Sequence, residues 1–261
     1  MLKPLACIAL QCVALLCVSG QVTAGEAPAP VPFGPGERSE YEVRVGFFGG
    51  SGEASMEVLG IEEVRGHPTY HLSFRLEGGV LFAKVEDRLD SWLDVSRLVS
   101  LRFDQNQHEV NYERHRIYEF YPEMGRWIRE NGSVGSLATE EPLDDVSFVY
   151  FARTLPLEVG TTHTLSRYFK EDGNPVILEV LRKERIDVPA GTFDTIVVRP
   201  IIRTSGLFGE GGEAELFFTD DDRRVLVQMR SRIPILGHLN LVLKSFEPGA
   251  PIPATAASID H

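Results

Sequence analysis

The most constraining feature of the sequence is an alternation of apolar and polar residues that recurs along most of its length. Tyr70, Leu72, Phe74 and Leu76 alternate with polar or charged residues, which is the pattern of a strand with one face in a core and the other in water. The same period of two recurs in the segments 41–47, 83–88, 176–180, 193–197, 214–218 and 239–243. Short segments rich in Gly, Pro, Asn and Asp separate many of these runs, as they do between hairpin strands. The sequence therefore predicts an all-β fold.

The number and spacing of these runs indicate about ten strands joined mostly by hairpins. We therefore expect a single large curved antiparallel sheet in the form of a half-barrel, a barrel or a sandwich. One segment, 144–154, breaks the alternation, because Asp144 or Asp145 can cap a short helix that ends before Pro156. This segment is too apolar on all sides for an exposed helix, so we expect it to plug one end of the sheet or cover one face.

The first residues of the chain have the composition of an export signal. Lys3 precedes an apolar stretch, and small residues then lead to a signal-peptidase site between Ala24 and Gly25. The apolar stretch is too short for a comfortable membrane span. We therefore expect a mature protein without a transmembrane span, exported to the periplasm of a bacterium of the Gram-negative type.

All three cysteines, Cys7, Cys12 and Cys17, lie within this signal. The mature chain therefore has no thiol for a disulfide, for catalysis or for metal binding. Cys17 is also a position at which a lipoprotein would carry its acyl chains, but Leu16 stands where lipoprotein signals have a small residue. We therefore expect a protein without a lipid anchor.

The rest of the chain divides by composition into three parts. We expect a Pro-rich linker at 25–37, a β domain at 38–247 and a flexible tail at 248–261.

Removal of Lys3 with the signal leaves 25 of the 26 basic side chains against 38 acidic ones, a net charge of −13. An acidic domain repels phosphate backbones, so we expect no nucleic-acid partner.

The sequence contains none of the common motifs for catalysis or metal binding. His67 and His71 share a strand face, but on a strand their Cα atoms lie about 13 Å apart, too far for one metal ion. The chain has no Gly-x-Ser-x-Gly motif, no phosphate-binding loop and no dinucleotide fingerprint. We therefore expect no cofactor, no metal and no enzymatic activity. A hydrolase whose site is assembled from distant residues is the least favoured alternative.

Four blocks of the sequence, in this order, resemble the domain of unknown function 3108 family of exported bacterial proteins. The blocks are PFGPGERSEYEVRVGFFGGSGEASMEV (32–58), LDDVSFVYFARTLPLEVG (143–160), IDVPAGTFDTIVVRP (186–200) and FFTDDDRRVLVQMRSRIPILGHLNLVL (217–243). Two details depart from the family pattern, since the aromatic pair at 217–218 ends in phenylalanine rather than tryptophan and the segment 225–227 lacks a proline. The resemblance implies an exported β protein. It brings no catalytic residues, because the family has none established.

Aromatic residues crowd the first half of the chain, where we expect the sheet to curve. One interpretation is that they fill an ordinary core. The other is that some of them line an apolar groove or cavity that holds a ligand. The candidate lining residues are Phe47, Tyr70, Phe74, Trp92, Phe120 and Tyr150. Arg114 and Arg116 lie within the same aromatic run, where they either orient an anionic head group or mark the solvent face of a strand.

The segment 205–213 is a second candidate feature, because it places Leu207 and Phe208 among glycines. Such a segment is typical of a flexible lid or of an apolar tip that touches a partner. The alternative is a long hairpin whose two apolar side chains fold back onto the sheet.

Together these features favour a non-enzymatic envelope protein whose curved sheet binds an apolar or amphipathic ligand, such as a lipid or an acyl chain. Its overall plan is similar to that of periplasmic lipoprotein carriers, which are half-barrels capped by a short helix, although a shared fold does not establish a shared function. The alternative is a structural or assembly protein with a filled interior that contacts envelope proteins through its surface. If the candidate aromatics all interlock with the helix around Tyr150, no cavity remains and the carrier hypothesis fails.

Overall fold

The computed structural model describes residues 31–45, 50–80, 83–109, 112–201, 214–233 and 237–250. Among the positions singled out from the sequence, Cys17, Ala24, Gly25, Phe47, Leu207 and Phe208 lie outside these ranges. The described residues form fourteen strands, one α-helix and two short 3-10 helices. In chain order these are β1 (Arg38–Val45), β2 (Gly50–Val64), β3 (His67–Val80), β4 (Ala83–Asp94), β5 (Ser100–Glu109), β6 (Tyr112–Tyr121), η1 (Pro122–Met124), β7 (Arg126–Arg129), β8 (Val134–Ser136), α1 (Ser147–Ala152), β9 (Thr162–Leu165), η2 (Glu171–Gly173), β10 (Val176–Val188), β11 (Gly191–Ile201), β12 (Glu215–Thr219), β13 (Leu226–Ile233) and β14 (Gly237–Glu247).

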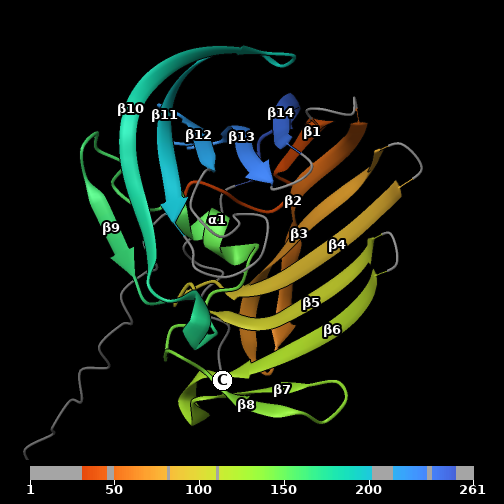
Figure 1. The fold of residues 1–261 in the computed structure, drawn as a ribbon. Helices are drawn as coiled ribbons and strands as arrows, with labels where there is room; N and C mark the ends of the chain where they lie inside the picture. The colour runs from red at the N-terminus through yellow and green to blue at the C-terminus, as the bar shows by residue number, and fades with distance from the viewer. Residues whose placement is uncertain are drawn as a thin grey trace, which may run out of the picture.

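All fourteen strands belong to one antiparallel sheet, in the order β8-β7-β6-β5-β4-β3-β2-β1-β14-β13-β12-β11-β10-β9. The first and last strands of the chain, β1 and β14, pair at its centre, so each half of the chain forms one wing. The sheet ends at two different strands, β8 and β9, so it is open. It curls strongly around α1 (Figure 1). The prediction of one large curved antiparallel sheet is confirmed, in its half-barrel form. Strands β7, β8 and β9 have only three or four residues, too few for a visible alternation.

Helix α1 belongs to the connection between the two edge strands, and this connection crosses the inside of the curl (Figure 1). Five of its six residues are buried. The Asp144 carboxylate caps the turn that leads into it, since Oδ1 accepts hydrogen bonds from the N–H groups of Val146 at 3.0 Å and Ser147 at 2.9 Å. The expected apolar helix is therefore present. Within the described ranges, no helix is long and apolar enough to cross a bilayer.

The folded body begins earlier than the composition suggested. Phe33 is buried, with its ring 5.1 Å from that of Tyr70 and 5.0 Å from that of Tyr150. At the other end of the chain, the Ala250 N–H donates to the Pro35 carbonyl at 2.8 Å. We expected a linker through residue 37 and a tail from residue 248, and the described ends of both segments, 31–37 and 248–250, make these contacts with the body or with each other. A Pro-rich segment packs here because one aromatic ring fills the gap between the sheet and α1.

Candidate ligand-binding site

The structure separates the predicted lining residues into three groups. Tyr70, Phe120 and Tyr150 are buried within a filled core, and Phe74 borders a cavity. Trp92 lies on the opposite, outer face of the sheet. Its ring stacks on His71 with centroids 4.4 Å apart, and its indole N–H donates to a Glu62 carboxylate oxygen at 2.7 Å.

The expectation that Trp92 lines the interior was therefore wrong. Its neighbours explain why, because Leu89, Ser91 and Leu93 are buried on the inner face and Trp92 lies between two of them. This orientation was predictable from the sequence, because Leu89 and Leu93 share one face of the strand and Trp92, one residue before Leu93, must lie on the other.

Aromatic rings fill the core around Tyr70, Tyr150 and Phe120. Phe33 bridges the rings of Tyr70 and Tyr150, and Phe120 packs against Phe169 with ring centroids 5.1 Å apart. Three of the six predicted lining residues therefore act as core residues. The candidate aromatics do not all interlock, however, because Trp92 faces outward and Phe74 does not share these ring contacts.

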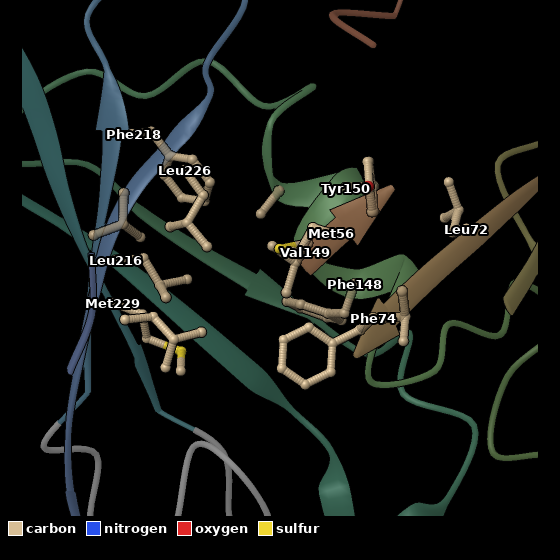
Figure 2. Packing of buried hydrophobic residues seen from close by; sticks show 14 of the residues in the cluster. Met56, Leu72, Phe74, Phe148, Val149, Tyr150, Leu216, Phe218, Leu226 and Met229 are labelled. Carbon is tan, nitrogen blue, oxygen red and sulfur yellow. The ribbon is translucent and has the colours of Figure 1, made fainter. Parts of the chain in front are cut away.

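Beside Phe74 a cavity of about 30 Å³ remains between the two wings of the sheet and α1. Figure 2 shows Leu216, Leu226 and Met229 of the C-terminal wing facing Phe74 and Val149 across this region. Its lining consists of Met56, Phe74, Leu89, Asp145, Val146, Val149, Leu216, Leu226, Met229 and Leu241. Nine of these ten residues are apolar, so the cavity favours hydrocarbon over water. Its volume is a tenth or less of that of a typical small-molecule site, about 300–1,000 Å³, so a larger occupant requires side chains to move.

The strand register extends this lining into a polar wall. On the inner face Met56 pairs with Phe74, Phe74 with Leu89, Leu89 with Gln105, and Gln105 with Arg116. One cross-strand row therefore runs from three cavity-lining residues to an amide and a guanidinium. Sequence reasoning missed this row because pairing depends on the bulges and turns that set the register.

A parallel row lies one step nearer the β3–β4 turn, and it too changes from apolar to polar. Leu76 pairs with Asp87, Asp87 with Gln107, and Gln107 with Arg114. The Gln107 amide donates to Asp87 Oδ2 at 3.4 Å. Burial raises the pKa of the Asp87 carboxyl.

Asp145 is the polar member of the cavity lining, and two side chains donate hydrogen bonds to it. The Tyr168 hydroxyl donates to Oδ1 at 3.0 Å and the Gln105 amide donates to Oδ2 at 3.3 Å. Burial raises the pKa of Asp145, while the charges of Lys170 and Arg114 oppose this rise. Together these residues form a polar wall: Asp87, Gln105, Gln107, Arg114, Arg116 and Asp145. Its two carboxyl groups each accept a hydrogen bond from an amide side chain, and its two guanidinium groups lie on β6.

Asp144 has a different role from its neighbour, because its hydrogen bonds tie α1 to the sheet. Ser91 Oγ donates to Asp144 Oδ2 at 2.6 Å, and Ser147 Oγ lies 2.8 Å from Ser100 Oγ. Burial raises the pKa of Asp144 to about 6. Between pH 3.8 and about 6, the native state therefore holds a proton on the Asp144 carboxyl that the unfolded chain has already released.

We expect Asp144→Asn to flatten the pH dependence of stability between pH 4 and pH 7. A raised native pKa means that the contribution of this group is full below pH 4 and is lost as pH rises through 6, by about 3 kcal/mol in total. Asparagine also caps helices well and carries no charge. Urea unfolding at several pH values measures the slope, with Asp194→Asn at an exposed position as the control. An unchanged slope in Asp144→Asn would contradict this assignment.

An open, curled antiparallel sheet with an internal helix defines a β-barrel-like protein. The chain belongs to the family described as "Protein of unknown function (DUF3108)", whose profile matches residues 40–244. It is also similar to the crystal structure of a β-barrel-like protein of the domain of unknown function DUF1849 from Brucella abortus, with 11% identity and a TM-score of 0.52 over 85% of this chain and 100% of the other. At that identity the likeness concerns the fold alone.

A second solved structure, described as a "putative lipoprotein" from Parabacteroides distasonis, matches with 12% identity and a TM-score of 0.36 over 84% of this chain and 99% of the other. A comparison with curated proteins gave no match.

Proposed function

We propose that this protein is a non-enzymatic protein of the bacterial envelope that binds an apolar or amphipathic ligand, a lipid or an acyl chain, inside its curled sheet. The observation that carries the proposal is the apolar cavity between the two wings, which adjoins a polar wall on the same inner face. An amphiphile has the same division into an apolar and a polar part. The export signal that the sequence predicts at 1–24 supports the location in the envelope.

The size of the cavity limits the occupant before any rearrangement. A volume of about 30 Å³ admits the end of a hydrocarbon chain rather than a whole lipid. Met56 and Met229 line opposite sides of it, and unbranched methionine side chains repack at low cost. Binding therefore widens an existing gap between the wings.

The second candidate is a protein that acts through its outer surface, as a structural or assembly component. The filled core around Phe33, Tyr70 and Tyr150 favours it. This candidate predicts that no amphiphile binds inside the sheet, so a binding experiment separates the two functions.

We expect Val149→Ile to stabilise the protein by about 0.5–1 kcal/mol and to weaken the binding of 1-decanol several-fold. The added methyl group enters the cavity that Val149 lines, and filling a cavity both improves packing and removes space for a chain. Both residues are β-branched, so helix propensity changes little. Urea unfolding and isothermal titration calorimetry measure the two effects.

Val159→Ile is the matched control, because Val159 is 49% exposed. It should change stability by less than about 0.5 kcal/mol and leave decanol binding unchanged. If wild-type protein binds neither 1-decanol nor an anionic ten-carbon amphiphile, the proposed function fails. If Val149→Ile binds decanol as the wild type does, the chain does not enter this cavity.

A further inference from the structure

Arg116 is an inward-facing cation for which the fold supplies no counter-ion among the described residues. It lies on the same face of β6 as Tyr118 and Phe120, which are buried in the core. Its side chain is only partly exposed. Within the parts of the chain that the structure describes, it has no hydrogen bond, ion pair or ring contact. A partly desolvated charge without a partner is costly, so a ligand of opposite charge that reached it would gain from the pairing.

Other cations near the end of the same strand are paired within the fold. On the outer face, Arg102 Nε contacts Glu119 at 2.5 Å and Arg65 pairs with the same carboxylate. On the outer face of β6, Glu119 thus serves as counter-ion to two arginines, whereas no described carboxylate pairs with Arg116 on the inner face.

Further positive charge converges near Arg116. Arg114 lies two residues away on the same face, about 7 Å along the strand. Lys170 reaches the same region, with Nζ 5.5 Å from the centre of the Tyr118 ring. The nearby carboxyl groups of Asp87 and Asp145 already accept hydrogen bonds from Gln107, Gln105 and Tyr168. Arg116 is therefore the cation at the inner end of β6 with which an anionic occupant of the interior would pair, and Arg114 and Lys170 add positive potential beside it.

The register places this charge within reach of the cavity. Leu89 lines the cavity, Gln105 is its partner on β5, and Arg116 is the partner of Gln105 on β6. Two strand spacings, about 10 Å, separate Leu89 from Arg116. A short segment of hydrocarbon is long enough to span this distance along the row from leucine through glutamine to arginine.

We propose that the ligand is a single-chain amphiphile with an anionic head, a carboxylate or a phosphate monoester, which pairs with Arg116 beside Arg114 while its chain enters the cavity next to Phe74. This inference rests on the proposed function, since it names the class of ligand for that same site. The guanidinium group suits both heads, because it donates two parallel hydrogen bonds to two oxygens of either one.

The test compares four probes by isothermal titration calorimetry on the full mature chain: decanoate, decyl phosphate, 1-decanol and acetate. The wild type should bind decanoate or decyl phosphate at least tenfold more tightly than decanol, and should bind acetate far more weakly than either. The tighter of the two anionic probes identifies the head group. Equal affinity for decanol and both anions would overturn the inference while the proposed function stands, whereas no binding of any ten-carbon probe would overturn the proposed function itself.

Arg116→Gln should lower the affinity for the preferred anion about tenfold or more and leave decanol binding unchanged, because a charge-assisted hydrogen bond is lost. Arg116→Lys retains the charge without the paired geometry and should recover part of the loss. Arg75→Gln, on the exposed outer face of β3, is the matched control and should bind all probes as the wild type does. An unchanged affinity of Arg116→Gln for both anions, in a variant that unfolds at the wild-type urea concentration, would overturn the assignment.

Discussion

Arg153→Met is expected to lower the free energy of unfolding by about 3–5 kcal/mol, because it leaves a buried carboxylate without its counter-ion. Arg153 and Glu37 are both about 5% exposed, and their side chains form a two-pronged pair at 2.6 and 3.0 Å. The same guanidinium donates to the carbonyls of Pro32 at 3.1 Å and Arg223 at 2.9 Å. This one side chain therefore joins the N-terminal segment, α1 and the β12–β13 turn. Urea denaturation followed by circular dichroism measures the loss.

Two further variants identify the origin of that loss. Glu37→Gln combined with Arg153→Met should recover part of the stability, since no uncompensated charge then remains in the core. Arg185→Ala removes one partner of an ion pair that is about 70% exposed on both sides, and should cost less than about 1 kcal/mol. A loss in Arg153→Met no larger than that of Arg185→Ala would show that the buried pair does not hold these segments together.

Phe169→Ala is expected to cost about 3–5 kcal/mol, because its ring connects the segment after β9 to the N-terminal wing of the sheet. The ring is fully buried, with centroids 6.3 Å from Phe103, 5.2 Å from Tyr118 and 5.1 Å from Phe120. Truncation leaves a large void against three aromatic neighbours that cannot collapse easily. Urea unfolding of the variant, with the slope of the transition compared with that of the wild type, measures this cost.

Phe169→Leu is the graded control for this prediction. Leucine retains much of the apolar volume, so the cost should be well below that of alanine. If Phe169→Ala costs less than about 1 kcal/mol, the contact between the two wings through this ring is not a main source of stability.

The fold class was predictable because its cause is local. Alternation along Tyr70, Leu72, Phe74 and Leu76 places every second side chain in the core whatever the strand pairs with, and the structure buries all four. The apolar helix was predictable for the same reason, and so was the Asp144 carboxylate that caps the turn leading into it, since such a cap acts within three residues of itself.

Features that depend on contacts between distant segments were not predictable. Glu37 lies 116 residues from Arg153, and neither position differs in sequence from many exposed charges. The row from Phe74 to Arg116 depends on three strand registers, one of them interrupted by an irregularity between Trp92 and Leu93. Periodicity places Arg116 on a face of its strand, but only the pairing shows which residues share that row.

The central claim is that the interior of the curled sheet holds an amphiphile. Native mass spectrometry of the protein purified from the envelope fraction, with a lipid extraction in parallel, tests it most directly. We expect one bound amphiphile per wild-type chain. The fraction of chains that carry it should fall in Val149→Ile and in Arg116→Gln and should be unchanged in Arg75→Gln. A wild-type mass equal to that of the polypeptide alone, unchanged when decanoate, decyl phosphate or 1-decanol is added, would contradict the account and favour a protein that acts through its outer surface.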